Sequence, residues 1–118
     1  MTAALAAVAV CLVSAAAAFQ TGLALGAPWG RAAYGGRAAA VDGRLPGRYR
    51  VASACTVLVL AVAGWAAVAD IGFLSWTFAG LFAINTATNL AGTHPVERWG
   101  MSAVTAVLAL AFATLALG

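Results

Sequence analysis

Four stretches of this chain contain no charged side chain, and they limit its fold more than any other feature. They cover residues 2–25, 51–69, 71–91 and 101–118. As α-helices, the first would extend about 36 Å and the second about 28 Å, enough to cross the hydrocarbon core of a bilayer, whereas the last is barely long enough. The Ala, Leu and Val runs lack the alternating polar positions of a barrel strand, and lipid offers no partner to an unpaired backbone group. The sequence therefore predicts four membrane-spanning helices.

The composition supports the same class of protein. Of 118 residues, 64% are hydrophobic and 8% are charged, and the mean hydropathy is +1.00. A soluble domain of this size needs far more polar surface. We therefore expect an all-α fold, an integral membrane four-helix bundle, built as a single membrane domain over residues 1–118. A cleavable signal peptide is the alternative for the first span, but no basic segment precedes it, and cleavage would leave the Arg-rich loop outside the cell.

All basic residues are arginines, and they lie in the two loops predicted at residues 27–50 and 92–100: Arg31, Arg37, Arg44, Arg48, Arg50 and Arg98. Four spans put both loops on one side of the membrane, and positively charged loops stay in the cytoplasm. Both termini are then outside. The net charge of +3 is interpreted as this topology signal, so we expect no nucleic-acid partner. The absence of Lys, with abundant Ala, Gly and Arg, indicates a bacterial source and hence the plasma (inner) membrane.

The tryptophans support this orientation independently. Trp29 and Trp99 fall at the cytoplasmic boundary of the predicted spans, and Trp65 and Trp76 fall towards the outer one. Because tryptophan is enriched at both membrane interfaces, the sequence predicts two aromatic belts.

Three features describe the connections. Asp70 alone separates the second and third spans, which predicts an antiparallel hairpin with Asp70 at its tip. Pro28, Pro46 and several glycines argue against a continuous helix in the first loop, although a short amphipathic segment at residues 31–41 could lie on the membrane surface. Pro95 is interpreted as a helix stop in the second loop.

Polar residues within the spans gather in their cytoplasmic halves. Asn85 and Asn89 share one helix face, and Gln20 lies at a comparable depth in the first span. Two interpretations stay open: hydrogen bonds that join helices, or a cytoplasm-facing polar pocket capped by Trp29, His94 and Glu97 from the loops. His94 and Glu97 are too few ligands for a metal site, so we expect no metal and no cofactor. Glu97 is expected to pair with Arg98 or with an arginine of the first loop.

Small residues suggest how the helices pack. Gly22 and Gly26 have the spacing that lets helix backbones approach closely, within the bundle or between copies in a homo-oligomer. Cys11 and Cys55 differ in depth by roughly 13 Å on helical rise, too far for a disulfide, and are interpreted as packing residues. The segments at residues 21–31 and 88–100 resemble each other, which suggests two helical hairpins in parallel repeat.

The chain also resembles a group of small bacterial four-span membrane proteins. The resemblance is carried by the LALGAPWG segment at residues 23–30, YGG at residues 34–36, Leu45 with Pro46, the Asn85 and Asn89 pair, and Glu97 with Arg98. It covers roughly a third of the chain. It implies a four-helix membrane architecture and no particular activity.

The function expected from these observations is non-enzymatic, because no nucleophile with a base, metal cluster or cofactor motif is present. The first hypothesis is contact of the cytoplasmic loops with a protein partner or anionic lipid headgroups, through Arg31, Tyr34, Arg37, Arg44, Arg48, Arg50 and Arg98. The alternative is a small-solute or ion transporter or channel subunit, with a polar path lined by Gln20, Asn85 and Asn89. A proton-coupled exporter would need a membrane carboxylate, and none of the four predicted spans holds one.

Overall fold

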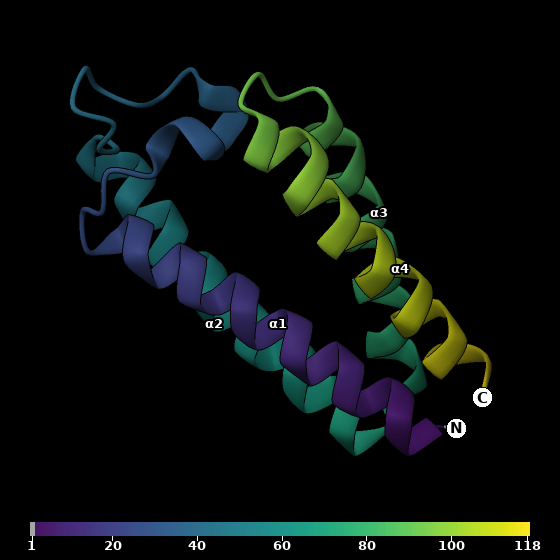
Figure 1. Ribbon diagram of the computed structural model, residues 1–118. Helices are drawn as coiled ribbons and strands as arrows, with labels where there is room; N and C mark the ends of the chain where they lie inside the picture. The colour runs from purple at the N-terminus through teal and green to yellow at the C-terminus, as the bar shows by residue number, and fades with distance from the viewer. Residues whose placement is uncertain (1) are drawn as a thin grey trace.

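The protein is all-helical in its computed structural model, which describes the backbone of residues 2–118 and the side chains of residues 3–118 (Figure 1). The long helices are α1 (Thr2–Ala24), α2 (Gly47–Ala69), α3 (Gly72–Leu90) and α4 (Ser102–Leu117). Two 3-10 turns, η1 (Gly30–Ala32) and η2 (Tyr34–Gly36), lie in the first loop, and a π-helical turn, η3 (Val96–Met101), leads into α4. Three helical segments are long and apolar enough to cross a membrane: Ala3–Ala24, Gly47–Ala69 and Val96–Leu117.

The helices form two hairpins that diverge from each other. α1 packs along α2, and α3 packs along α4, whereas contacts between the hairpins are fewer. Figure 1 shows the hairpins together near both termini and apart at the loop end. α2 and α3 are joined by Asp70 and Ile71, one residue more than predicted, and Asp70 adopts the left-handed conformation that ends α2. The two helices then separate instead of packing along each other, so the expected hairpin of the second and third spans is wrong.

Buried alanines hold the hairpins together at the terminal end. The main core contains alanines from all four helices, together with Phe78, Phe82 and Phe112: the alanines are Ala9, Ala63, Ala66, Ala67, Ala79 and Ala111. Small side chains let helix backbones approach closely, and the three phenylalanines fill the space that remains. This core does not extend to the loop end, where a second, smaller cluster of Leu23, Ala33 and Leu45 packs the first loop onto α1 and α2.

Two helix starts differ from the sequence-based boundaries. α2 begins at Gly47, four residues earlier than expected, and helical structure before α4 begins at Val96 instead of residue 101. Pro46 and Pro95, with φ of −59° and −57°, precede these starts. Proline is well accommodated at the beginning of a helix, so Pro95 starts a helix where a stop was expected. As a result the two loops are shorter than residues 27–50 and 92–100, and Glu97 lies in a helical segment.

The first loop folds back onto the end of α1. Gly26, with φ of +94°, ends the helix in a Schellman arrangement, in which the Ala27 N–H donates to the Gly22 carbonyl and the Gly26 N–H to the Leu23 carbonyl. A Cβ on Gly22 would overlap the Trp29 ring. Gly22 and Gly26 therefore shape the loop, and within one molecule they form no helix-packing face. Residues 31–41 form no amphipathic helix, because the only helical structure in this segment is the pair of short 3-10 turns η1 and η2.

Candidate functional site

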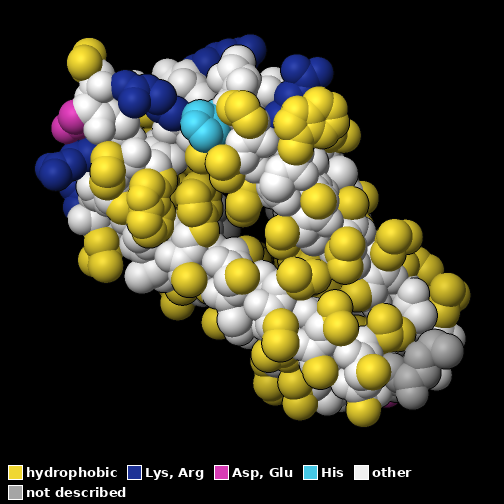
Figure 2. Space-filling model, viewed as in Figure 1, with side chains coloured by type: hydrophobic (Ala, Val, Ile, Leu, Met, Phe, Trp, Pro, Cys, Tyr) yellow, Lys and Arg dark blue, Asp and Glu magenta, His cyan; other side chains and the backbone are white. Residues whose placement is uncertain are grey.

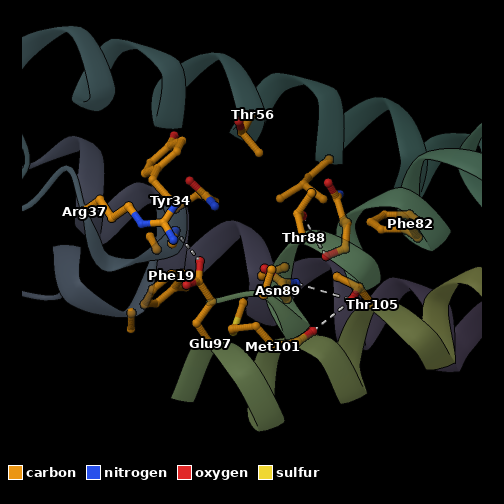
Figure 3. Close-up of a pocket in the computed structure, with 18 residues that line it drawn as sticks. Phe19, Tyr34, Arg37, Thr56, Phe82, Thr88, Asn89, Glu97, Met101 and Thr105 are labelled. Atoms are coloured by element: carbon orange, nitrogen blue, oxygen red, sulfur yellow. Dashed lines mark hydrogen bonds between the residues drawn. The ribbon is translucent and has the colours of Figure 1, made fainter. Parts of the chain in front are cut away.

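A cavity of about 540 Å³ lies between the two hairpins, at the loop end of the molecule. Figure 2 shows the surface hollowed between the hairpins, and Figure 3 shows the side chains around the cavity. Every long helix and both loops contribute to its lining, which is formed by Ala16, Phe19, Gln20, Ala32, Ala33, Tyr34, Gly35, Arg37, Thr56, Leu60, Phe82, Asn85, Thr88, Asn89, Ala91, Glu97, Met101 and Thr105. The lining therefore combines apolar walls with hydroxyl, amide and charged groups.

Aromatic rings close the cavity towards the termini. Phe82 lines it, and its ring centroid lies 5.6 Å from that of Phe112 and 6.3 Å from that of Phe78. These three rings belong to the main core, in which Phe112 is fully buried. Packed aromatic rings leave little free volume, so the cavity ends here.

At the loop end, the segment 30–37 connects the two hairpins, and we call it the strap. The Tyr34 hydroxyl is hydrogen-bonded to Ser53 Oγ of α2 at 2.9 Å. On the other hairpin, the Gly35 N–H donates to Glu97 Oε2 at 3.1 Å, and Thr93 Oγ1 donates to the Gly35 carbonyl at 3.1 Å. Tyr34 and Gly35 both have positive φ, of 52° and 73°. The glycine suits this left-handed turn, whereas Tyr34 is held in it by its contacts.

Glu97 is the buried charged residue of the cavity. It is 4% exposed, and its Oε1 is buried without a hydrogen-bond partner. A Cβ on Gly92 would overlap Oε1, so this glycine makes room for the carboxylate. The expected ion pair of Glu97 with an arginine is not formed. Among the residues that the structure describes, the only ion pair joins Arg44 to Asp42, at 3.9 Å. The sequence places Glu97 in a loop, and only the early start at Val96 brings it into a candidate span.

The amide residues predicted for the polar pocket line this cavity and make different contacts. Asn89 Nδ2 donates to Thr105 Oγ1 at 3.4 Å, beside a hydrogen bond of 2.9 Å between the Thr86 and Thr105 hydroxyls, so Asn89 helps to join α3 to α4. Asn85 is exposed to the cavity and makes no side-chain hydrogen bond within the described part of the chain. Gln20, on α1, has its Oε1 buried without a partner. Both interpretations of these amides therefore retain support, helix joining for Asn89 and a pocket for Asn85 and Gln20.

Trp29 and His94 lie outside the main cavity, although they were predicted to cap it. They line a neighbouring cavity of about 340 Å³ with Phe19, Pro28, Arg31, Ala32 and Val96. The Trp29 ring stacks on Phe19, with centroids 5.9 Å apart. His94 Nδ1 accepts the Val96 N–H at 3.2 Å, which satisfies a free donor at the start of η3. Phe19 and Ala32 belong to both cavities, so the two are neighbours across this wall.

The arginines gather at the loop end (Figure 2), but they have different roles. Arg31 and Arg50 donate to the backbone carbonyls of Val41 and Ala24, and Arg50 thereby binds the C-terminal end of α1. Arg48 and Arg98 lie over the Tyr49 and Trp99 rings, each 5.1 Å from the ring centroid. Arg37 lines the main cavity. Two of the six arginines predicted for external contact therefore hold the first loop in place.

Several residues of the site were not predicted. Phe19, Thr56, Phe82 and Thr105 line the cavity, and Ser53 and Gly92 support it. The Gly35 and Gly36 pair was a usable signal for a sharp turn in the strap, whereas an apolar or hydroxyl side chain in a span carries no sign of which neighbour it faces.

Comparison of the chain with protein-family models, with curated protein sequences and with solved structures found no match. The resemblance to small bacterial four-span proteins stays a prediction.

Proposed function

We propose that this protein is a multi-pass membrane protein that binds a small organic solute between its two helical hairpins and acts as a carrier or carrier subunit. The observation that carries this proposal is the cavity of about 540 Å³, which has the size typical of small-molecule sites. Its aromatic and aliphatic walls suit the apolar part of a solute, and Gln20, Thr88 and Asn85 offer polar contacts. The proposed role is binding and transfer without chemical change, so the protein would not be an enzyme.

The membrane arrangement that we propose is a four-helix bundle in which α3 also spans. Among the four long helices, only α3 is not part of a segment that is apolar enough to cross a membrane. Four polar residues near its C-terminal end lower its hydropathy: Asn85, Thr86, Thr88 and Asn89. Its 19 residues extend about 28 Å beside α4, which does belong to such a segment. The molecule is 46 Å long, close to the thickness of a bilayer with its headgroups. The Arg-bearing end would face the cytoplasm of a bacterial cell.

Transfer across the membrane would use the weak contact between the hairpins. Each hairpin packs well internally, and the two meet mainly through the alanine core at the terminal end. If the hairpins form a parallel repeat, one can rock against the other about this core and close the loop end while the terminal end opens. The present arrangement would then be the state that is open to the cytoplasm.

Water access to the cavity tests this proposal. In a Cys11→Ala, Cys55→Ala background, we expect Asn85→Cys to react with a membrane-impermeant maleimide applied to inside-out vesicles, because this position faces the cavity. The matched control is Ile84→Cys, next to Asn85 in the sequence. The Ile84 side chain is 62% exposed and does not line the cavity. It should react slowly, since a thiol in lipid is not ionised. Equal and slow reaction at both positions would contradict a hydrated cavity.

A second candidate function is contact of the loop end with anionic lipid headgroups. Arg48 and Arg98 favour it, because both are exposed and neither is in an ion pair among the described residues. Trp29 and Trp99 are exposed at the same end and would lie at headgroup level. The test is the amount of phosphatidylglycerol retained by the purified protein, which Arg48→Gln with Arg98→Gln should lower and Thr114→Ala should not.

A further inference from the structure

Two residues that line the cavity each carry a buried side-chain oxygen without a hydrogen-bond partner among the described residues. One is Glu97 Oε1, at the start of the fourth helical segment, and the other is Gln20 Oε1, on α1. Both residues line the same cavity. Each oxygen is an acceptor, and a buried acceptor left without a donor destabilises the protein by its full cost of desolvation. These two acceptors in the lining of the cavity therefore lack donors.

The deficiency at Glu97 also concerns charge. Its other oxygen, Oε2, receives only the neutral Gly35 N–H. No arginine or histidine of the described chain lies within ion-pair distance of the carboxylate. Buried carboxylates in proteins are normally paired with a cation, because burial without one is strongly unfavourable.

We propose, on the basis of the solute-binding function above, that the solute carries a protonated primary amine bound by Glu97 Oε1, with Gln20 Oε1 as a second acceptor. An ammonium group has three donors, no acceptor and a positive charge, so it meets both deficiencies. A hydroxyl would meet only the first. Phe19, Tyr34 and Phe82, labelled in Figure 3, provide ring faces for the organic part of the solute and for the cation.

Arg37 is the residue that competes with such a solute. It lines the same cavity, two residues after the Gly35 that binds Glu97. The Arg37 side chain is exposed and is in no ion pair among the described residues. An ammonium in the cavity would be repelled by it. Replacement of Arg37 by a neutral residue should therefore strengthen binding of an amine, whereas it should weaken the fold if Arg37 is the structural partner of Glu97.

The experiment compares three probes of nearly equal shape: phenethylammonium, neutral 2-phenylethanol and anionic 3-phenylpropionate. The full chain in lipid nanodiscs is heated at rising probe concentrations, and the shift of the unfolding midpoint gives each dissociation constant. We expect phenethylammonium to bind at least tenfold more tightly than the other two. Glu97→Gln should abolish this preference, and Arg37→Gln should tighten amine binding several-fold. The control Asp70→Asn, which neutralises a carboxylate at the opposite end, should change neither.

Gln20→Leu keeps the test decisive if Glu97→Gln does not fold. It should weaken amine binding several-fold and raise the unfolding midpoint of the free protein, because it removes a buried acceptor without a partner. Tighter binding of the neutral or anionic probe, or an unchanged preference in Glu97→Gln, would overturn the amine assignment and leave the solute-binding function standing. Absence of binding by all three probes also overturns it, and the accessibility of Asn85→Cys then decides separately whether the cavity is a hydrated site.

Discussion

At the scale of single residues, two glycines make room for a charged and an aromatic side chain. Gly92 gives the carboxylate of Glu97 its place, and Gly22 gives the Trp29 ring its place over α1. Neither role follows from spacing, because the partner of each glycine is in another segment. Gly80 and Gly100, by contrast, have no atom near an added Cβ.

Gly92→Ala is expected to destabilise the protein by about 1–3 kcal/mol, because the new methyl group displaces the Glu97 carboxylate and breaks its hydrogen bond with the Gly35 N–H. The measurement is the free energy of unfolding in mixed micelles. Gly80→Ala is the control, for which the helix propensity of alanine predicts a change of about 0.5–1 kcal/mol in the stabilising direction. The same loss in both variants would show that the overlap at Gly92 is relieved without moving Glu97.

At the scale of elements, the strap holds the hairpins at a distance that the alanine core alone would not keep. Tyr34 contacts α2 through the hydrogen bond with Ser53, a longer one of 3.4 Å to the Tyr49 carbonyl, and the Tyr49 ring, 5.1 Å away between centroids. Contacts with the other hairpin involve Thr93 and Glu97. η3 contributes as well. Its π-helical turn, in which the Ser102 N–H donates to the Glu97 carbonyl, joins Glu97 to α4 with one residue more than an α-helical turn has.

The strap contact with α2 can be measured by a double-mutant cycle. Tyr34→Phe leaves the fully buried Ser53 hydroxyl without its partner, and Ser53→Ala removes the other half, so each should destabilise the protein by about 1–2 kcal/mol. Together they should cost little more than one alone, with a coupling energy of about 1 kcal/mol. Tyr49→Phe is the control, since the Tyr49 hydroxyl has no partner among the described residues. Additive losses would mean that the hydroxyls do not hold the strap.

At the scale of the whole molecule, the distribution of side chains defines two ends. The arginines and His94 gather at the loop end, and apolar side chains cover the visible surface along the helices (Figure 2). Trp65 and Trp76 are exposed near the terminal end, opposite Trp29 and Trp99. This pattern is compatible with a membrane protein that has exposed tryptophans near both ends.

Orientation in the membrane can be checked with two reporter cysteines in the Cys11→Ala, Cys55→Ala background. Val41 is 96% exposed in the first loop, and Asp70 is exposed at the opposite end. If the loop end is cytoplasmic, an impermeant maleimide added to intact cells should label Asp70→Cys and leave Val41→Cys unlabelled until the membrane is opened. Labelling of both in intact cells would indicate that copies insert in both orientations.

The sequence by itself determined the helical class, the approximate extent of the long helices and the gathering of arginines at one end. These properties depend on local hydrophobicity, charge and helical length, which can be summed residue by residue. It also indicated that Gln20, Asn85 and Asn89 belong to one region, because their depths along the helices agree, and that Glu97 of the second loop lies next to them. All four line the main cavity.

Only the tertiary structure decided which helices pack together, where the hairpins diverge and which polar groups lack a partner. Alanines occur on every face of these helices, so the sequence does not show that Ala9, Ala66 and Ala111 meet at one end. The burial of Glu97 depends on Pro95 starting a helix, on space beside Gly92 and on the strap from the other hairpin. Such contacts join residues as far as 62 positions apart, and their energies depend on the complete packing and not on any segment alone.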